Sequence, residues 1–158
     1  MSRQVLSRQV SSAPEAWVRL LRAHASTTRT LSAQLQAEHE LSINDYEALL
    51  HLSREGGHMR RVDLAQKLLL TQSGVTRLLE GLERCGLVEK GSCPSDLRVT
   101  YAVLTDEGRK RLHEASESHL AAVRALFSEH FTAEELEQLA ELLGRLPGAG
   151  GDPGACSP

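Results

Sequence analysis

The chain has 158 residues, 41% hydrophobic and only 3% aromatic, which suits one mainly helical domain rather than two domains or an aromatic-rich β-sandwich. Its net charge of −3 is unevenly distributed, because residues 59–111 carry ten Lys and Arg against seven Asp and Glu, the sign that contact with phosphate requires. No apolar run reaches about 18 residues and no secretory signal opens the chain, so we expect a soluble, cytoplasmic protein without membrane partners.

The first predicted element is a long amphipathic helix over about residues 13–40. Ser12 can cap its start, and Glu15 can complete a capping box. Apolar side chains then recur at helical spacing, beginning with Trp17.

Three shorter helices are predicted next. Ser42 can cap the first, which two glycines end, and residues 62–68 form a second helix that has no Ser, Thr or Asn to cap it. Thr71 can cap the third, which should end at Gly86. Its apolar side chains are expected to face inward, namely Val75, Leu78, Leu79 and Leu82.

A hairpin and two further helices complete the pattern. Residues 87–90 and 98–104 have extended character, and the turn residues between them, Gly91, Pro94 and Ser95, mark a hairpin loop. Thr105, followed by two acidic residues, begins a fifth helix, and Thr132 begins a sixth with a capping box. From Pro147 onward the composition predicts disorder.

A short helix, a tight turn, a second helix and a two-stranded hairpin form, in this order, a winged helix-turn-helix. The outward face of the helix after Thr71 is polar, and its side chains can donate hydrogen bonds to base edges in a major groove about 12 Å wide. The candidate DNA-binding residues on this face are Gln72, Ser73, Thr76 and Arg77. Taken alone, such a face is more often simply solvated.

The hairpin residues resemble the MarR family of bacterial transcription factors (multiple antibiotic resistance regulators). Asp96 and Arg98, then Leu104-Thr105 and Gly108, fit the family pattern D-x-R, five residues, L-T, two residues, G. Further matches are Leu64-Ala65, Thr76-Arg77-Leu78, Leu82-Glu83 and Gly86-Leu87-Val88. The resemblance implies that Arg98 enters the minor groove and that Asp96 holds its guanidinium group. Leu97 departs from the pattern, since many relatives have a basic residue there.

The resemblance also implies a function and an assembly. It predicts a homodimeric, sequence-specific regulator of transcription, a repressor of its own and neighbouring genes, which a small-molecule effector releases from a pseudo-palindromic operator in double-stranded DNA. We expect one domain over residues 12–146, flanked by a flexible N-terminus, 1–11, and a disordered tail, 147–158. Within it, the DNA-binding lobe covers about 42–104, and the dimerisation helices cover about 13–40 and 105–146.

The family's effector cleft lies between the dimerisation helices and the DNA-binding lobe. Candidate effector contacts in this chain are therefore Trp17, His24, Tyr46 and His51. The simpler interpretation of such residues on apolar helix faces is that they belong to the core.

Other function classes have weaker support in the sequence. No nucleophile or cofactor-loop motif occurs and the histidines lack zinc-site spacing, so we expect no enzyme, no cofactor and no metal site. One alternative is a thiol-based redox regulator using Cys85 or Cys93, which would require a lowered thiol pKa. Another is a winged helix that binds protein, although an apolar face would suit that role better than a polar and basic one.

Overall fold

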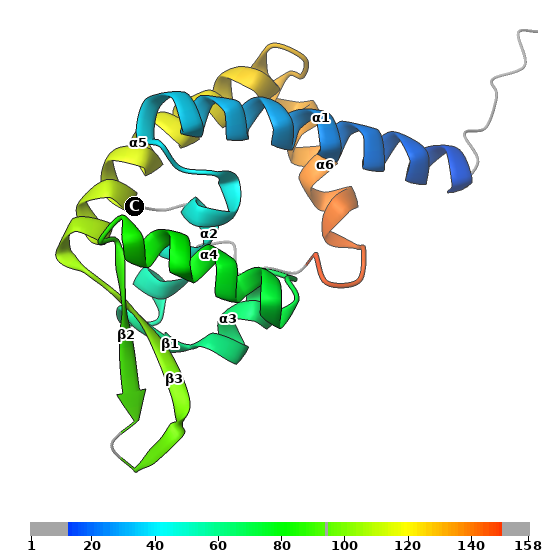
Figure 1. The fold of residues 1–158 in the computed structure, drawn as a ribbon. Coiled ribbons are helices and arrows are strands. Elements are labelled where there is room, and N and C mark those ends of the chain that lie inside the picture. The colour runs from blue at the N-terminus through cyan, green and yellow to red at the C-terminus, as the bar shows by residue number, and fades with distance from the viewer. Residues whose placement is uncertain (1–12, 94, 150–158) are drawn as a thin grey trace, which may run out of the picture.

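The computed structural model describes residues 13–93 and 95–149, and these residues form a mainly helical fold with one small sheet (Figure 1). The elements run in the order α1 (Ala13–His39), α2 (Ile43–Arg54), β1 (His58–Arg60), α3 (Arg61–Lys67), α4 (Gln72–Arg84), β2 (Val88–Cys93), β3 (Asp96–Leu104), α5 (Asp106–Ser128) and α6 (Ala133–Gly144). None of the helices in these described stretches is long and apolar enough to cross a membrane. The expected Ser12 cap, the N-terminus 1–11 and the tail beyond residue 149 lie outside the described residues.

Four helices begin directly after residues that the sequence predicts as caps. Ser42 and Asp45 form a capping box, in which the Ser42 hydroxyl accepts the Asp45 N–H at 3.1 Å and the Asp45 carboxylate accepts the Ser42 N–H at 2.9 Å. Thr132 and Glu135 form a second capping box at α6, while the hydroxyls of Thr71 and Thr105 cap α4 and α5 by accepting the N–H of Gly74 and of Gly108. As expected, α3 begins without a side-chain cap.

The turn between α3 and α4 contains a strained residue. The N–H of Leu70 donates to the carbonyl of Ala65 at 3.1 Å, which closes the helix with the backbone in the left-handed region at Leu69, φ +53°. The corresponding residue after α4 is the predicted Gly86, φ +71°. Leucine disfavours this region because its Cβ approaches the following carbonyl, and the Leu69 side chain is 93% exposed.

The sheet has three antiparallel strands in the order β1-β3-β2, and the sequence pattern does not predict β1. Its three residues pair with β3, with Arg60 opposite Tyr101. The hairpin loop is shorter than the sequence predicts, because Gly91 lies within β2 and pairs with Tyr101 of β3. The two longer strands form the wing, defined here as β2, β3 and their connection.

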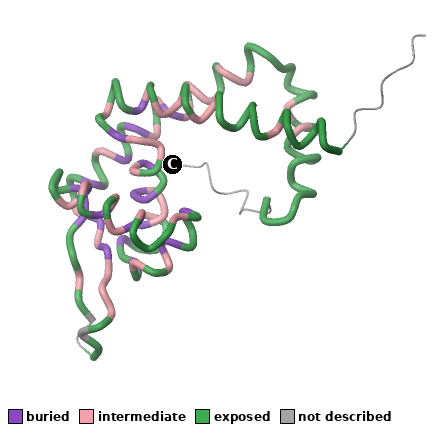
Figure 2. The backbone as a smooth tube through the Cα atoms, turned by 45° about the vertical axis from the view of Figure 1, so that its right-hand side comes forward, coloured by how far each residue is buried: buried purple, intermediate pink, exposed green. Residues whose placement is uncertain are grey.

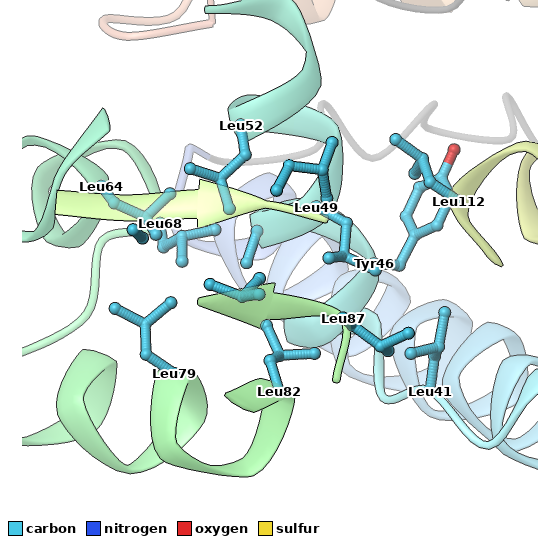
Figure 3. Close-up of a cluster of buried hydrophobic side chains, with 14 of the residues drawn as sticks. Leu41, Tyr46, Leu49, Leu52, Leu64, Leu68, Leu79, Leu82, Leu87 and Leu112 are labelled. Atoms are coloured by element: carbon cyan, nitrogen blue, oxygen red, sulfur yellow. The ribbon is translucent and has the colours of Figure 1, made fainter. Parts of the chain in front are cut away.

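The hydrophobic core lies between α2, α3, α4 and the inner face of the sheet (Figure 3). Val75, Leu79 and Leu82 of α4 are buried as expected, and Leu78 is partly buried. Three residues join the longer helices to this core, Leu35 of α1 and Leu112 and Ala115 of α5. The core therefore holds the outer face of α4 in a fixed position.

The first half of α1 and all of α6 lie away from this core, and Figure 2 shows both largely exposed. Trp17 is 59% exposed, and Leu142 of α6 is 55% exposed. The C-terminal half of α1 packs beside α5, where the carbonyl of His39 accepts from Arg111 at 2.8 Å (Figure 1).

Candidate nucleic-acid interface

Helix α4 presents the predicted polar side chains to solvent. Gln72, Ser73 and Arg77 are exposed, opposite the buried apolar face of the helix. Thr76 is half-buried, and its hydroxyl donates to the carbonyl of Gln72 at 2.9 Å. Since the apolar face is anchored in the core, the polar face has a defined direction.

On the wing, Asp96 and Arg98 are both exposed. The Asp96 carboxylate accepts a hydrogen bond from the backbone N–H of Arg98 at 3.0 Å, rather than holding the guanidinium group as the family resemblance implies. Among the described residues, the ion pairs do not include the Arg98 guanidinium. Asp96 therefore shapes the start of β3 and leaves the arginine fork available to a partner.

A groove of about 290 Å³ lies between α4 and the wing. We call it the α4–wing groove, and it is lined by Arg60, Arg61, Val62, Gln72, Val75, Thr76, Arg98, Val99 and Thr100. It brings together three of the six predicted DNA-binding residues, while Ser73, Arg77 and Asp96 lie outside its lining. Arg98 supplies it with a cation that takes no part in the ion pairs of the described residues, whereas Arg60 and Arg61 are paired with carboxylates.

Arg60 and Arg61 also line this groove, and the sequence analysis did not predict them as site residues. Their side chains reach it because β1 pairs with β3 and α3 begins directly afterwards. The Arg60 guanidinium forms two hydrogen bonds to Asp63, at 2.6 and 2.9 Å. The adjacent basic residues were the available signal, but only the strand pairing places them beside Arg98.

Glu83 connects α4 to α3 and to β2. Its carboxylate accepts from Arg61 of α3 at 2.5 Å and lies 3.6 Å from the ammonium group of Lys90 in β2. The Arg61 and Glu83 side chains are both mostly buried, while Lys90 is exposed. The Nε atom of Arg61 is buried with no partner among the described residues, so Glu83 provides the main compensation for this charge.

The four candidate effector residues lie in different surroundings. Trp17 and His24 are exposed on α1. Burial raises the pKa of Glu47 in α2, and the nearby His24 offsets part of this rise. Tyr46 is buried, as in the simpler core interpretation. His51 is half-buried, and its pKa is lowered by burial and by the charges of Lys67 and Arg54.

A polar cluster that the sequence interpretation missed lies where α1, α2 and α5 meet. The rings of Tyr46 and His119 lie 4.7 Å apart, and the Tyr46 hydroxyl is 3.3 Å from that of Ser116. Nearby, the His39 imidazole is 2.6 Å from the hydroxyl of Ser118. Burial lowers the pKa of His119, and its Nδ1 atom has no partner in the described part of the chain. His119 therefore favours the neutral form.

Cys85, one of the two candidate redox residues, is a free and exposed thiol. It occupies the C-cap of α4. Cys93 ends β2, and its side chain lies outside the described set.

Comparison with known proteins identifies the same fold. A family model described as "MarR family" matches residues 39–98, which include α4 and most of the wing. The uncharacterised HTH-type transcriptional regulator YkoM of Bacillus subtilis is 31% identical over 67% of this chain and 68% of its own length.

Two solved structures from Streptomyces coelicolor are also similar. The MarR family transcriptional regulator AbsC superposes with a TM-score of 0.73 and 32% identity, covering 84% of this chain and 90% of its own. The MarR family regulator Sco3205, solved in complex with DNA, superposes with a TM-score of 0.75 and 30% identity, covering 83% and 84%. The identity, the coverage and the shared winged fold together show that this chain belongs to the MarR family of DNA-binding transcriptional regulators.

Proposed function

We propose that the chain recognises a specific operator by placing α4 in the major groove of DNA and the wing in the adjacent minor groove. The observation that carries this proposal is the convergence of Gln72, Thr76 and the exposed Arg98 on one groove. Short polar side chains on a helix suit base edges, whereas a guanidinium group suits the narrow, electronegative minor groove. Ser73 and Arg77 extend the base-reading face, and Asp96 fixes the backbone that carries Arg98.

The proposed assembly is a homodimer formed by α1, α5 and α6. Its support is the exposed apolar surface on α1 and α6, since a monomer would leave these side chains in water. They include Trp17, Val18, Leu21, Leu142 and Leu143, with Leu146 directly after α6. We retain residues 12–146 as the domain, with a DNA-binding lobe over about 42–104 between dimerisation segments over about 13–40 and 105–146. A two-fold axis would place two α4 helices about 34–36 Å apart on successive major grooves.

Within this assembly we propose that the chain represses its own and neighbouring genes until a small effector releases it. The junction of α1, α2 and α5 supports this role, because there the DNA-binding lobe of each protomer joins the dimerisation helices. A ligand wedged into this junction would change the spacing of the two α4 helices in the dimer. Trp17, His24, Tyr46 and His51 remain the candidate effector contacts of the proposal, with Tyr46 at this junction and Trp17 on the exposed first half of α1. Oxidation of Cys85 or Cys93 is the competing signal, supported by the exposed thiol at the end of α4.

An electrophoretic shift assay on the promoter of the chain's own gene and its divergent neighbour tests DNA binding. We expect Arg98→Ala to weaken operator binding about tenfold or more, because it removes the minor-groove contact. Arg54→Ala, an exposed arginine of α2 outside both the α4–wing groove and the proposed dimer helices, is the control and should bind as the wild type does. Equal affinities for the wild type and Arg98→Ala would contradict the proposal.

Repeating the assay with candidate ligands and with peroxide separates the two signals. Release by a ligand under reducing conditions supports the effector mechanism. Release by peroxide that is lost in Cys85→Ser or Cys93→Ser supports the redox alternative.

A further inference from the structure

Arg60, Arg61 and Val62 line the α4–wing groove from the end of β1 and the start of α3, and neither element enters a DNA groove in the proposed binding mode. In B-DNA, a major groove and the adjacent minor groove are separated by one sugar–phosphate backbone. With α4 in the first and the wing in the second, this backbone passes through the α4–wing groove between them. These three residues therefore face phosphates and deoxyribose rings rather than base edges.

The two arginines of this segment differ in how accessible they are. The Arg61 side chain is 18% exposed and is bound to Glu83, whose carboxylate is also mostly buried. The Arg60 side chain is 52% exposed, and it pairs with Asp63 in the first turn of α3. Of the two, Arg60 is therefore the one whose guanidinium group a phosphate can approach from solvent.

Asp63 binds only one edge of the Arg60 guanidinium group. Its carboxylate accepts from Nε at 2.6 Å and from Nη2 at 2.9 Å. The hydrogens of Nη1 and the second hydrogen of Nη2 lie along the other edge and form a second pair of donors. Such a pair matches two oxygens of a phosphate group. An arginine that is already held along one edge also loses less rotamer freedom when it binds.

The rest of this part of the groove suits a sugar ring. Val62 is exposed and Val99 is half-buried, and both line the groove. Neither side chain can form a hydrogen bond, but each can pack against the carbon atoms of a deoxyribose ring. No acidic residue is among the described residues that line the groove, so a backbone lying there meets no carboxylate in its walls.

We propose that Arg60 is a phosphate-binding residue of this protein and that Asp63 is the positioning residue that presents it. Arg60 binds one phosphate of the backbone that runs between α4 and the wing, while Arg61 supports α4 through Glu83. This inference rests on the proposed function, and it adds a contact that is independent of base sequence to the base-reading residues of α4.

Fluorescence anisotropy with the operator and with random DNA, over a range of salt concentrations, tests the role of Arg60. We expect Arg60→Gln to weaken both complexes about fivefold or more, because a charge-assisted hydrogen bond to the backbone is lost on either sequence. The slope of log affinity against log salt should fall by about one per protomer, since one phosphate is no longer neutralised.

Lys67→Gln is the matched control for this change. Lys67 also lies on α3 and also pairs with an exposed acid, Glu55, but it is outside the lining of the α4–wing groove. It should therefore keep the salt dependence of the wild type.

A methylphosphonate scan of the operator locates the contact, because each substitution neutralises one phosphate. We expect one position on the backbone between the α4 site and the wing site at which neutralisation weakens the wild type about fivefold. The same substitution should leave the affinity of Arg60→Gln unchanged, since the two changes remove the same interaction.

Asp63→Asn, made in the wild type and in Arg60→Gln, tests the positioning role. We expect its effect on operator affinity to be about threefold more unfavourable when Arg60 is present, because only then is there a guanidinium group to orient. Equal effects in the two backgrounds would overturn this role. A more favourable effect with Arg60 present would overturn it too, since it would show that Asp63 masks the arginine.

Two results would overturn the phosphate contact while the proposed function stands. They are operator binding by the wild type with an unchanged salt slope in Arg60→Gln, and a methylphosphonate profile that is the same in both proteins. A wild type that binds no DNA would overturn the proposed function together with this inference.

Discussion

Arg77 is exposed on the same side of α4 as Gln72 and Ser73 but does not line the α4–wing groove. A guanidinium in this position can read the O6 and N7 acceptors of a guanine. We therefore predict that Arg77→Ala weakens binding to the operator by about 1–3 kcal/mol and relaxes the preference at one or two base pairs. Fluorescence anisotropy with the operator, single-base variants of it and random DNA measures both effects. The same loss on operator and random DNA would show that Arg77 contacts only phosphate.

His119 is a titratable residue in a buried position, 9% exposed, beside the ring of Tyr46. Burial lowers its pKa below the ordinary value of 6.5, so the folded protein holds fewer protons at this site than the unfolded chain does. The free energy of unfolding should consequently fall as the pH decreases through about 6.5, and this contribution should be absent at pH 8, where both states are neutral.

Urea unfolding at pH 8 and pH 5.5, at a fixed protein concentration, measures this pH dependence. We predict that His119→Phe loses less stability between these pH values than the wild type, because phenylalanine cannot be protonated. The exposed His113 lies on the same helix, and His113→Gln should keep the wild-type difference. An unchanged difference in His119→Phe would exclude His119 as its source.

At the scale of elements, Glu83 links α4 to α3 and to the wing. Glu83→Gln leaves the mostly buried charge of Arg61 without its ion partner, so we predict a loss of about 1–3 kcal/mol in the free energy of unfolding. The affinity for the operator should also fall, because the wing loses one attachment to α4. Glu80→Gln, an exposed change on the same helix, is the control, and the two variants are compared by urea unfolding and anisotropy. Equal stability in both variants would rule out this role.

The turn between α3 and α4 carries Leu69 in the left-handed region. Leu69→Gly removes a conformational cost of about 1–2 kcal/mol but increases the entropy of the unfolded chain, so we predict a net gain of roughly 0.5–1 kcal/mol. Leu69→Ala keeps the Cβ atom and loses only exposed side-chain atoms. It should therefore be no more stable than the wild type, and thermal unfolding of the three proteins separates these outcomes.

At the scale of the whole molecule, α1 and α6 expose the apolar side chains that we assign to the dimer (Figure 2). Placing charges in that interface without partners is costly, so Leu142→Glu combined with Leu146→Glu should raise the dimer dissociation constant about a hundredfold or more. Removing residues 147–158 should leave the dimer intact, because residues 147–149 are exposed and the composition of this segment predicts no packed structure. Sedimentation equilibrium at micromolar concentration measures both, and a monomeric wild type would contradict the assembly.

The starts of four helices, and the polar and apolar faces of α4, could be predicted from the local sequence. Ser42, Thr71, Thr105 and Thr132 each act within one turn of their own position, so capping depends on a few neighbouring residues. The polar face of α4 followed for the same reason, since periodicity is a local property. The family pattern around Arg98 then linked this face to the wing.

Which distant residues contact one another depends on the three-dimensional fold, and the local sequence does not predict it. The strand β1 is too short to have a recognisable period, and it exists because His58–Arg60 pair with β3, more than forty residues later in the chain. That pairing places Arg60 and Arg61 beside Arg98 in the α4–wing groove. It also forms a second groove, which is lined by residues that include His58, Tyr101 and Arg109. Sheet pairing and side-chain packing depend on contacts between remote segments, which propensity and spacing along a single chain do not encode.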